Sequence, residues 1–465
     1  MSISVSAAKI LSQRSHLVPG KLRVTEHFFQ VPRDYTNPSN GTIQLFARSC
    51  RKAEKPADYP PPGTTEDPKK TQLPWIVYLQ GGPGFQCGPP QDLAWAETIL
   101  SKGYQILCLD QRGTGLSTAI SQSSLQLRGD EKVQAEYMKS FRADSIVKDC
   151  EAVRKALTYD YPEEKKKWSV IGQSFGGFCT TTYLSHYPEG VKEAFLFGGL
   201  PPNKRGPDEV YARLYRRVRE RNEKYYEKYP EDVERVKRIV KLLQKNGDTT
   251  VRVQGGEGYL SARRFLQLGI YFGKHGGFDS VHNYVLRADT DLTQFGHLTR
   301  PTVIALEEAQ SFDTNVIYTL LHEPCYCSNT ASNWSAERLI ASYPEFSLQD
   351  EADNPIFFTG EMIYPFMLEC YSELKKLAPV AEALAKDEKW PELYDWKQLA
   401  KNEVPVYAAV YYDDMYVDFD LSMETAGKIK GCKTYVTNAM YHDAIRSKMD
   451  NVFKALFALR DDVID

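Results

Sequence analysis

A serine flanked by glycines follows an apolar run in the first half of the chain. Residues 172–176 read Gly-x-Ser-x-Gly, with Ser174 at the centre and the run WSVI directly before it. Where a strand enters a helix through such a turn, the serine hydroxyl is exposed above the sheet, and the small glycines avoid side-chain clashes. A hydroxyl held there becomes a nucleophile when a general base lies beside it. The pattern therefore predicts Ser174 as a nucleophile; a serine in an ordinary tight turn is the alternative.

A serine nucleophile of this kind requires an acid and then a histidine later in the chain. Of the eight histidines, only His442 falls in the last segment of strand-like and helix-like sequence, just after KTYVTN. Asp414 ends the earlier strand-like segment AAVYYDD, with Asp413 as the adjacent alternative and Asp418 as a weaker one. The order Ser174, Asp414, His442 predicts a triad in which the base activates the serine and the acid orients the base.

Glycines after an earlier strand-like segment offer donors for the oxyanion that forms during acyl transfer. The segment LPWIVYLQGGPG ends in Gln80–Gly84, and backbone N–H groups stabilise an oxyanion without reorganisation. We expect Gly82 to supply one donor, with Gly81 as the alternative. The N–H of Phe175, directly after the serine, is expected to supply the other.

The elements that must position these residues alternate between strands and amphipathic helices up to about residue 205. This alternation is typical of a mostly parallel sheet with helices on both faces. Ile146, Cys150, Val153 and Leu157 have the spacing of one helix face. The earlier segments LRVTEHFFQVP and TIQLFARSC predict an antiparallel hairpin, and the loop at 55–70 is too rich in proline and charge to build core.

The sequence texture divides the chain into three parts. Near residue 206 it changes to a densely charged helical pattern, beginning YARLYRRVRERNEKYYEKY, and strand-like sequence returns at VPVYAAVYY. We therefore expect residues 1–205 to form the first part of an α/β core, 206–399 an inserted helical cap and 400–465 the second part of the core.

Composition and charge narrow the class of partner. The 465 residues are 42% hydrophobic, enough for a large core, and the net charge of −3 comes from interspersed charges that favour neither nucleic acid nor an anionic membrane. No apolar run has the length of a signal peptide core or membrane span. Nine scattered cysteines suit reduced thiols, so we expect a cytoplasmic protein with a small partner.

No metal site or cofactor is expected. Cys325 and Cys327 are the only closely spaced cysteines, and they lack further ligands at zinc-site spacing. Apolar surface on the helical region is compatible with a homo-oligomer, which the sequence leaves open.

Several motifs together resemble the proline iminopeptidases, also called prolyl aminopeptidases, which are serine peptidases of the α/β-hydrolase fold. These motifs are GGPG after the first buried strand, DQRGTGLS after the next, GQSFGG, DDMYV and a late His-Asp pair. Gln80 departs from the family, which commonly has histidine before the glycines, but the backbone donors are unaffected. For Asp110 and Arg112, within DQRGTG, we expect a buried ion pair that ties loops together rather than a role in the chemistry.

The resemblance implies a cap whose acidic residues bind the free amino terminus of a peptide. On the motifs LLHEPCYC and FTGEMIYPFM these residues are Glu323 and Glu361, the latter beside Tyr364 and Phe366. For either glutamate, a solvated helix face is the alternative from the residues alone. The resemblance further implies an enzyme that uses an acyl-enzyme to release N-terminal proline from small peptides, with the release of other small N-terminal residues left open.

Other functions are compatible with a triad on this fold. An esterase or a C–C bond hydrolase would share the triad but has no use for paired cap carboxylates. Epoxide hydrolases and dehalogenases need a carboxylate where this chain has Ser174. A non-catalytic binding protein of the same fold would tolerate the loss of a triad member, and none is missing. The sequence thus predicts an α/β-hydrolase fold with an inserted helical cap and a serine aminopeptidase activity, with these alternatives.

Overall fold

The computed structural model describes residues 3–462 apart from 54–71, 246–247, 254–255 and 349–353. The loop expected at 55–70 lies outside the described residues. In the described part, nine strands form one sheet in the order β1-β2-β3-β5-β4-β6-β7-β8-β9. The strands are β1 (Lys9–Val18), β2 (Leu22–Pro32), β3 (Thr42–Lys52), β4 (Trp75–Leu79), β5 (Gln105–Asp110), β6 (Trp168–Gln173), β7 (Val191–Phe197), β8 (Val406–Tyr411) and β9 (Cys432–Thr437).

The sheet is parallel from β5 to β9 and antiparallel from β1 to β5. The predicted hairpin is confirmed as the pair β2 and β3, and the mostly parallel sheet is confirmed as well. β1 was not expected from the sequence. It is an edge strand whose side chains are mostly exposed, so its sequence lacks the apolar alternation that marks a half-buried strand.

Helices cover both faces of the sheet, as predicted. Along β4, Ile76 and Tyr78 belong to one apolar core with helices α2 and α19, whereas Val77 and Leu79 belong to a second core with α5 and α6. The helices of this half are α2 (Ala96–Leu100), α3 (Gln122–Gln126), α4 (Glu131–Met138), α5 (Ala143–Leu157), α6 (Phe175–His186), α17 (Phe419–Ala426), α18 (Ala444–Ser447) and α19 (Met449–Asp461). Burial on both faces explains why the strands read as continuous apolar runs.

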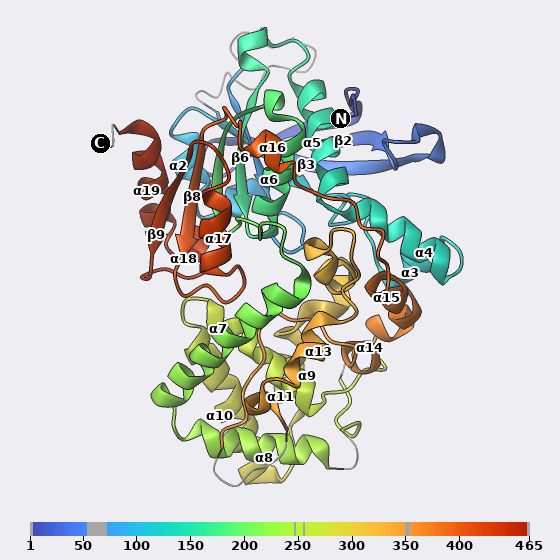
Figure 1. Ribbon diagram of the computed structural model, residues 1–465, viewed down its shortest axis with the longest axis vertical. Helices are drawn as coiled ribbons and strands as arrows, with labels where there is room; N and C mark the ends of the chain where they lie inside the picture. Colours follow the sequence, from blue (N-terminus) through green and yellow to red (C-terminus); the bar gives the residue numbers. More distant parts are fainter. Residues whose placement is uncertain (1–2, 54–71, 246–247, 254–255, 349–353, 463–465) are drawn as a thin grey trace.

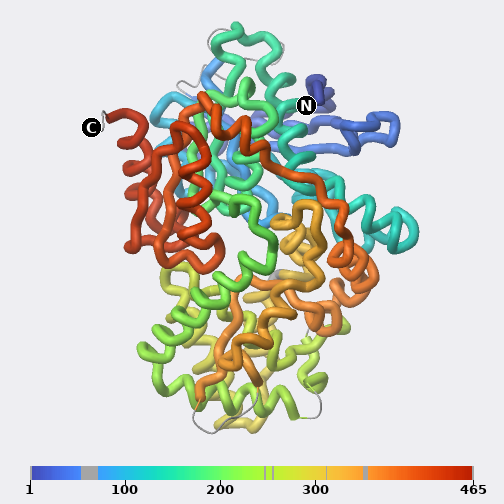
Figure 2. The backbone as a smooth tube through the Cα atoms, in the orientation of Figure 1, coloured from blue at the N-terminus to red at the C-terminus, as the bar shows by residue number. Residues whose placement is uncertain are grey.

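The chain between β7 and β8 is helical and forms most of the lower half of the molecule (Figures 1 and 2). Its helices are α7 (Pro207–Lys228), α8 (Asp232–Gln244), α9 (Ala262–Leu266), α10 (Gly277–Phe295), α11 (Arg300–Glu308), α12 (Val316–Leu321), α13 (Ser335–Ile340), α14 (Met367–Cys370), α15 (Ala378–Ala385) and α16 (Trp396–Leu399). The helical character expected from the sequence is thus present, while the division at 1–205, 206–399 and 400–465 stays a prediction. α15 lies against α4 and α16 against α6, so the helical region also contacts the sheet half at its side.

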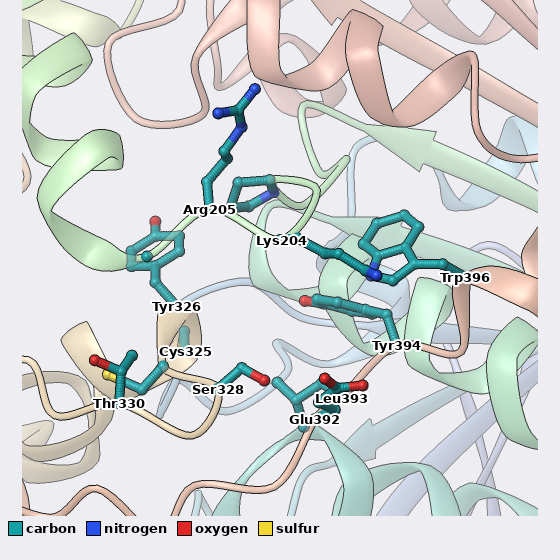
Figure 3. A pocket seen from close by; sticks show the side chains of 13 residues that line it. Lys204, Arg205, Cys325, Tyr326, Ser328, Thr330, Glu392, Leu393, Tyr394 and Trp396 are labelled. Carbon is teal, nitrogen blue, oxygen red and sulfur yellow. The ribbon is translucent and has the colours of Figure 1, made fainter.

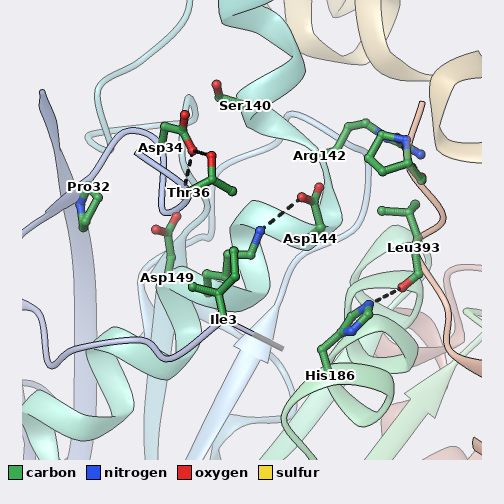
Figure 4. A network of polar contacts seen from close by, with 12 residues as sticks. Ile3, Pro32, Asp34, Thr36, Ser140, Arg142, Asp144, Asp149, His186 and Leu393 are labelled. Atoms are coloured by element: carbon green, nitrogen blue, oxygen red, sulfur yellow. Dashed lines mark hydrogen bonds and ion pairs between the residues drawn. The ribbon is translucent and has the colours of Figure 1, made fainter. Parts of the chain in front are cut away.

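Polar contacts join the two halves where they meet (Figure 4). The buried guanidinium of Arg142, just before α5, donates to the carbonyl oxygens of Cys327 at 2.9 Å and Pro391 at 3.3 Å. It also lies 4.8 Å from the ring centroid of Trp390. The His186 ring at the end of α6 contacts the carbonyl oxygen of Leu393 at 3.1 Å. The segment that returns from the helical region is therefore fixed to the first part of the core.

The predicted ion pair between Asp110 and Arg112 is wrong, because Arg112 pairs with a different carboxylate. The Arg112 guanidinium is buried against Asp149 of α5, with Nε and Nη2 each 2.6 Å from a carboxylate oxygen, and it also donates to three backbone carbonyls. Asp110 instead accepts the backbone N–H groups of Cys87 and Leu116. Because β5 ends at Asp110 and the chain turns there, the two side chains serve different neighbours. Both still tie loops together, as expected.

None of the nine cysteines forms a disulfide. Among the described residues, no helix combines the length and the apolar character needed to cross a bilayer.

Candidate active site

Ser174 occupies the sharp turn between β6 and α6. Its backbone has φ 54° and ψ −124°, a left-handed conformation that a non-glycine residue adopts at a cost. The Ser174 N–H donates to the carbonyl of Phe197 at the end of β7, and its own carbonyl accepts the Gly177 N–H at 2.7 Å. These bonds hold the strained residue in place at the carboxyl end of the sheet, as the motif predicts.

The glycines around Ser174 are required by close backbone contacts. A Cβ at Gly176 would lie 1.9 Å from the carbonyl oxygen of Leu79, and one at Gly177 would lie 2.3 Å from that of Gly199. A Cβ at Gly172 would lie 2.6 Å from the carbonyl oxygen of Gly176. The turn therefore packs directly against β4 and the loop after β7, and no larger residue fits there.

The structure brings His442 and Asp414 together at the same edge of the sheet. Asp414 follows β8 and His442 follows β9, which are neighbouring parallel strands, and Nδ1 of His442 lies 2.8 Å from Oδ2 of Asp414. The positive φ of Gly198 after β7 brings backbone against this pair: a Cβ there would lie 3.1 Å from His442 Nδ1. His442 and Ser174 line the same cavity.

Of the three candidate acids, Asp414 contacts His442. Its second oxygen accepts the N–H groups of Tyr416 and Val417 at 2.8 and 3.1 Å, which fixes the carboxylate toward His442. Asp413 lies 3.7 Å from the Lys224 ammonium. Asp418 accepts the N–H of Leu421 at the start of α17 and lies near two arginines.

Buried charges around His442 set its protonation. Burial lowers the pKa of His442, but the charge and hydrogen bond of Asp414 and the charge of Glu361 raise it more, and the nearby Arg446 lowers it. The net effect is a pKa above the ordinary value of 6.5. The imidazole is therefore a stronger base than a free histidine.

The predicted oxyanion donors lie beside the serine. The loop after β4 passes so close that a Cβ at Gly81 would lie 2.9 Å from the Cβ of Ser174, and both Gly82 and Ser174 line the cavity. Phe175 is the first residue of α6, so its N–H is one of the unpaired donors of a helix N-terminus. Gln80 accepts a hydrogen bond from Tyr78 at 2.6 Å. The choice between Gly82 and Gly81 stays a prediction.

Glu361 reaches the serine from the helical region. The cavity has a volume of about 310 Å³, and Glu361 lines it together with Ser174, His442 and Tyr416. The Tyr318 hydroxyl donates to Oε1 of Glu361 at 2.6 Å. The carboxylate of Glu361 therefore shares one small cavity with Ser174 and His442.

Burial makes Glu361 an unusual carboxylate. Burial raises the pKa of Glu361 to about 7, although the nearby His442, the Tyr318 hydrogen bond and Lys274 each lower it. A carboxylate with so few partners is costly to keep charged unless a cation joins it. The site is thus suited to a cationic group supplied by a ligand.

The structure does not bring Glu323 to this cavity, which corrects the expectation that, together with Glu361, it binds the amino terminus of the peptide. The two oxygens of its buried carboxylate accept the backbone N–H groups of Ser335 and Ala336 at 3.1 and 3.0 Å, at the start of α13. These are unpaired donors of a helix N-terminus, which carboxylates satisfy well. The motif fixes the position of Glu323 in the chain, but the 3₁₀ turn it starts directs its side chain into the helical region.

The aromatic residues around the site differ from those expected. Tyr364 is buried against Tyr215, with their hydroxyls 3.0 Å apart, and Phe366 lies against the Arg263 guanidinium. Neither lines the cavity. The aromatic side chains that line it or the narrow void beside it are Phe85, Tyr271, Phe312, Tyr318, Tyr416, Phe175, Phe178 and Tyr326. Sequence reasoning missed Tyr318 and Tyr416, because a buried tyrosine in an apolar segment carries no signal of its own.

A narrow void beside Ser174 continues the cavity toward Phe178, His322 and Tyr326. Burial lowers the pKa of His322 to about 4, so that its ring is neutral. Behind it lies a second cavity of about 270 Å³, into which Lys204, Tyr394 and Trp396 project (Figure 3). Tyr326 lines both spaces and forms part of the wall between them.

One group in the described part of the chain has donor atoms close enough for a metal ion: Glu231, Asp232 and His282. Asp232 is already engaged there by Tyr225 and Arg235. None of the three lines the cavity at Ser174.

Comparisons with known proteins agree with this architecture. A family model described as the alpha/beta hydrolase fold matches residues 74–256. The chain is 46% identical over 462 residues to the proline iminopeptidase aneH of Aspergillus aculeatus, and this alignment covers 99% of each chain. It is 38% identical to a proline iminopeptidase of Aeromonas sobria, over 97% of this chain and all of the relative.

Among solved structures, the proline iminopeptidase of Mycobacterium smegmatis is 14% identical over 97% of each chain, with a TM-score of 0.39. The two full-length relatives carry the assignment. The chain therefore belongs to the proline iminopeptidases, serine aminopeptidases of the α/β-hydrolase fold.

Proposed function

We propose that the protein releases N-terminal proline from small peptides through an acyl-enzyme on Ser174. The observation that carries this proposal is the position of Glu361, a partly buried carboxylate that lines the same cavity as Ser174 and His442. It distinguishes an aminopeptidase from an esterase or a C–C bond hydrolase, neither of which needs an anion there. The kinship with full-length proline iminopeptidases supports the same activity.

Acylation begins with His442. Its Nε2 accepts the hydroxyl proton of Ser174 as Oγ attacks the carbonyl carbon of the first residue. Asp414, bonded to Nδ1 at 2.8 Å, holds the correct tautomer and stabilises the imidazolium that forms. The N–H groups of Gly82 and Phe175 stabilise the oxyanion. The raised pKa of His442 favours this proton uptake.

Release follows by the reverse use of the same base. The imidazolium donates its proton to the leaving amine, and the shortened peptide departs. A water molecule, deprotonated by His442, attacks the acyl carbon and frees proline from Ser174. The cycle uses residues of this chain only.

Glu361 sets the register of the substrate. Its carboxylate pairs with the ammonium of the peptide, a cation that the substrate brings to the cavity. With the amine fixed there, the first peptide carbonyl is the one within reach of Ser174. Exopeptidase specificity then follows from geometry. Glu323, which holds α13, takes no part in this pairing.

The aromatic part of the cavity of about 310 Å³ is the proposed place of the pyrrolidine ring. Its walls include Phe85, Phe312, Tyr318 and Tyr416, whose rings bury the carbon of the substrate. Other small N-terminal residues, such as alanine, would contact these rings less completely. Proline is therefore the preferred residue, and small residues are poorer substrates.

We further propose that residues 206–399 act as a cap over the site, because Glu361 and Tyr318 come from that part of the chain. A cytoplasmic location is supported by nine cysteines that are all free of disulfides.

The test is a substrate panel with a nucleophile variant. Wild-type protein is assayed on proline and alanine chromogenic amides and on a short acyl ester, beside Ser174→Ala. We expect wild type to hydrolyse proline amide faster than alanine amide. Ser174→Ala should turn over none of the substrates, while its circular dichroism spectrum should show an intact fold. If Ser174→Ala hydrolysed proline amide at the wild-type rate, Ser174 would be ruled out as the nucleophile. If wild type cleaved the ester and neither amide, the esterase would be the better assignment.

A further inference from the structure

Two cationic side chains line the cavity at Ser174 and have no part in the mechanism above. Lys274 follows the 3₁₀ turn Gln267–Gly273 of the helical region, and Arg446 lies in α18, shortly after His442. Among the described residues, neither forms an ion pair with a carboxylate. The Lys274 ammonium lies 4.8 Å from the ring centroid of Tyr271, which is a weaker partner than an anion.

The two cations lie close enough to repel each other. Burial lowers the pKa of Lys274, and the charge of Arg446 lowers it further, while Glu361 and Asp443 raise it. Glu308 also lines the cavity, but its side chain is exposed and pairs with neither cation. Lys274 is partly buried and Arg446 is exposed, so an anionic group of a ligand between them would gain two opposite charges.

The cavity thus carries charges of both signs. Glu361 supplies the negative group, and Lys274 and Arg446 supply positive groups in the same space of about 310 Å³. A volume at the low end of the range for ligand sites suits a short peptide rather than a long chain. A short peptide is itself a zwitterion, with an ammonium at one end and a carboxylate at the other.

We propose that Lys274 and Arg446 form a subsite for the C-terminal carboxylate of di- and tripeptides whose ammonium is held by Glu361. This inference rests on the proposed function and adds a substrate class to it. The two ends of the peptide are then fixed by opposite charges, with the scissile bond at Ser174 between them. An acidic side chain on the second residue is the other source of the same chemical group.

The test compares matched substrates that differ in one charge: Pro-Ala, Pro-Ala-amide and Pro-Asp-amide. Release of proline is measured as kcat/KM for wild type, Lys274→Met, Arg446→Gln and the double variant. We expect wild type to favour Pro-Ala over Pro-Ala-amide by roughly tenfold or more, since a hydrogen bond to a charged group contributes about that factor. Each single variant should reduce the preference, the double variant should abolish it, and added salt should weaken it.

Two controls isolate the charge. Lys274→Arg keeps the cation and should keep the preference, as should Lys448→Met, which removes an exposed lysine that does not line the cavity. The ratio of the two substrates is the readout because Lys274 also lowers the pKa of Glu361. Both substrates share the ammonium, so an effect through Glu361 changes their rates together and leaves the ratio unchanged.

Three results would overturn the inference. Equal kcat/KM for Pro-Ala and Pro-Ala-amide in wild type contradicts it and leaves the aminopeptidase intact. A preference that survives in the double variant assigns it to other groups. A stronger gain for Pro-Asp-amide than for Pro-Ala shows that the subsite reads a side chain instead of the C-terminus. If wild type releases proline from none of the three substrates, the result contradicts the proposed function itself.

Discussion

Two carboxylates near His442, Asp414 and Glu361, have very different surroundings. Asp414 accepts hydrogen bonds from two backbone N–H groups and contacts the histidine, whereas Glu361 accepts a hydrogen bond from the Tyr318 hydroxyl. Burial raises the pKa of Glu361 to about 7. Environments that separate two carboxylates in this way give them separate tasks. Asp414 is suited to orient the base, and Glu361 to gain a cation when substrate binds.

The first residue-scale prediction concerns the acid. Asp414→Asn should lower kcat for proline amide by as much as ~10⁴-fold, the scale reached when a catalytic histidine is held in the wrong tautomer. Asp413→Asn, whose side chain lies toward Lys224, is the matched control and should keep most of the activity. Steady-state kinetics of the two variants decide whether Asp414 or Asp413 is the acid. A larger loss for Asp413→Asn would assign the acid to the neighbouring position.

The second concerns the pH dependence of the base. His442 must be neutral to accept a proton, and its pKa is above 6.5, so kcat/KM should rise with pH through a midpoint above 6.5. The Glu361 charge raises that pKa, so Glu361→Gln should move the midpoint of a neutral ester's profile to lower pH. An unshifted profile would show that the charge of Glu361 does not affect the pKa of His442. For proline amide the same variant should lose about 2 to 5 kcal/mol in kcat/KM, the range for one partner of a buried pair.

At the scale of elements, the catalytic turn could be predicted because its chemistry is written in backbone requirements. The contacts of Gly172, Gly176 and Gly177 leave no space for a Cβ, so the motif and the geometry are one constraint. Asp414 and His442 were predictable for a related reason. Each follows a strand, and neighbouring parallel strands end at one edge of the sheet.

Side-chain direction within irregular segments could not be predicted. Glu323 lies in the expected motif, yet its carboxylate serves α13, and Arg112 pairs with Asp149 of α5 instead of Asp110. Lys274 follows a 3₁₀ turn and carries no motif at all. Such contacts depend on how distant segments pack, which neither spacing nor composition records.

The element-scale prediction follows from the new role of Glu323. Glu323→Ala removes the acceptor of two buried N–H groups at the start of α13 and should lower the free energy of unfolding by about 1 to 3 kcal/mol. Urea denaturation measures the loss. Glu337→Ala, a partly exposed glutamate of α13 paired with Arg263, is the control and should cost about 1 kcal/mol or less. A stable Glu323→Ala with a large increase in KM would instead return Glu323 to the substrate site.

At the scale of the whole molecule, the helical half supplies Glu361, the group to which we assign the specificity of the site. Ser174, Asp414 and His442 come from strand ends, while Glu361 and Tyr318 come from the chain between β7 and β8. The sequence predicted this two-part organisation from its texture. It did not predict the contacts between the parts, because they join segments far apart in the chain, such as Arg142 and Pro391.

The whole-molecule prediction tests that junction. Arg142→Leu leaves the carbonyls of Cys327 and Pro391 without their donor and should lower the free energy of unfolding by about 1.5 to 3 kcal/mol. Lys148→Leu loses only a contact to Asp144 within α5 and should cost about 0.5 kcal/mol or less. Equal unfolding midpoints for the two variants would show that the junction contributes little.

The central claim is that Glu361 selects a free amine beside Ser174, and acetylation of the substrate tests it most directly. Acetyl-proline amide keeps the ring and the scissile bond of proline amide but cannot carry the positive charge that Glu361 requires. The measurement is kcat/KM for the two amides with one preparation of wild-type protein. We predict hydrolysis of proline amide and no detectable hydrolysis of acetyl-proline amide. Comparable kcat/KM values for the two would contradict the claim and make a general amidase or esterase the better account.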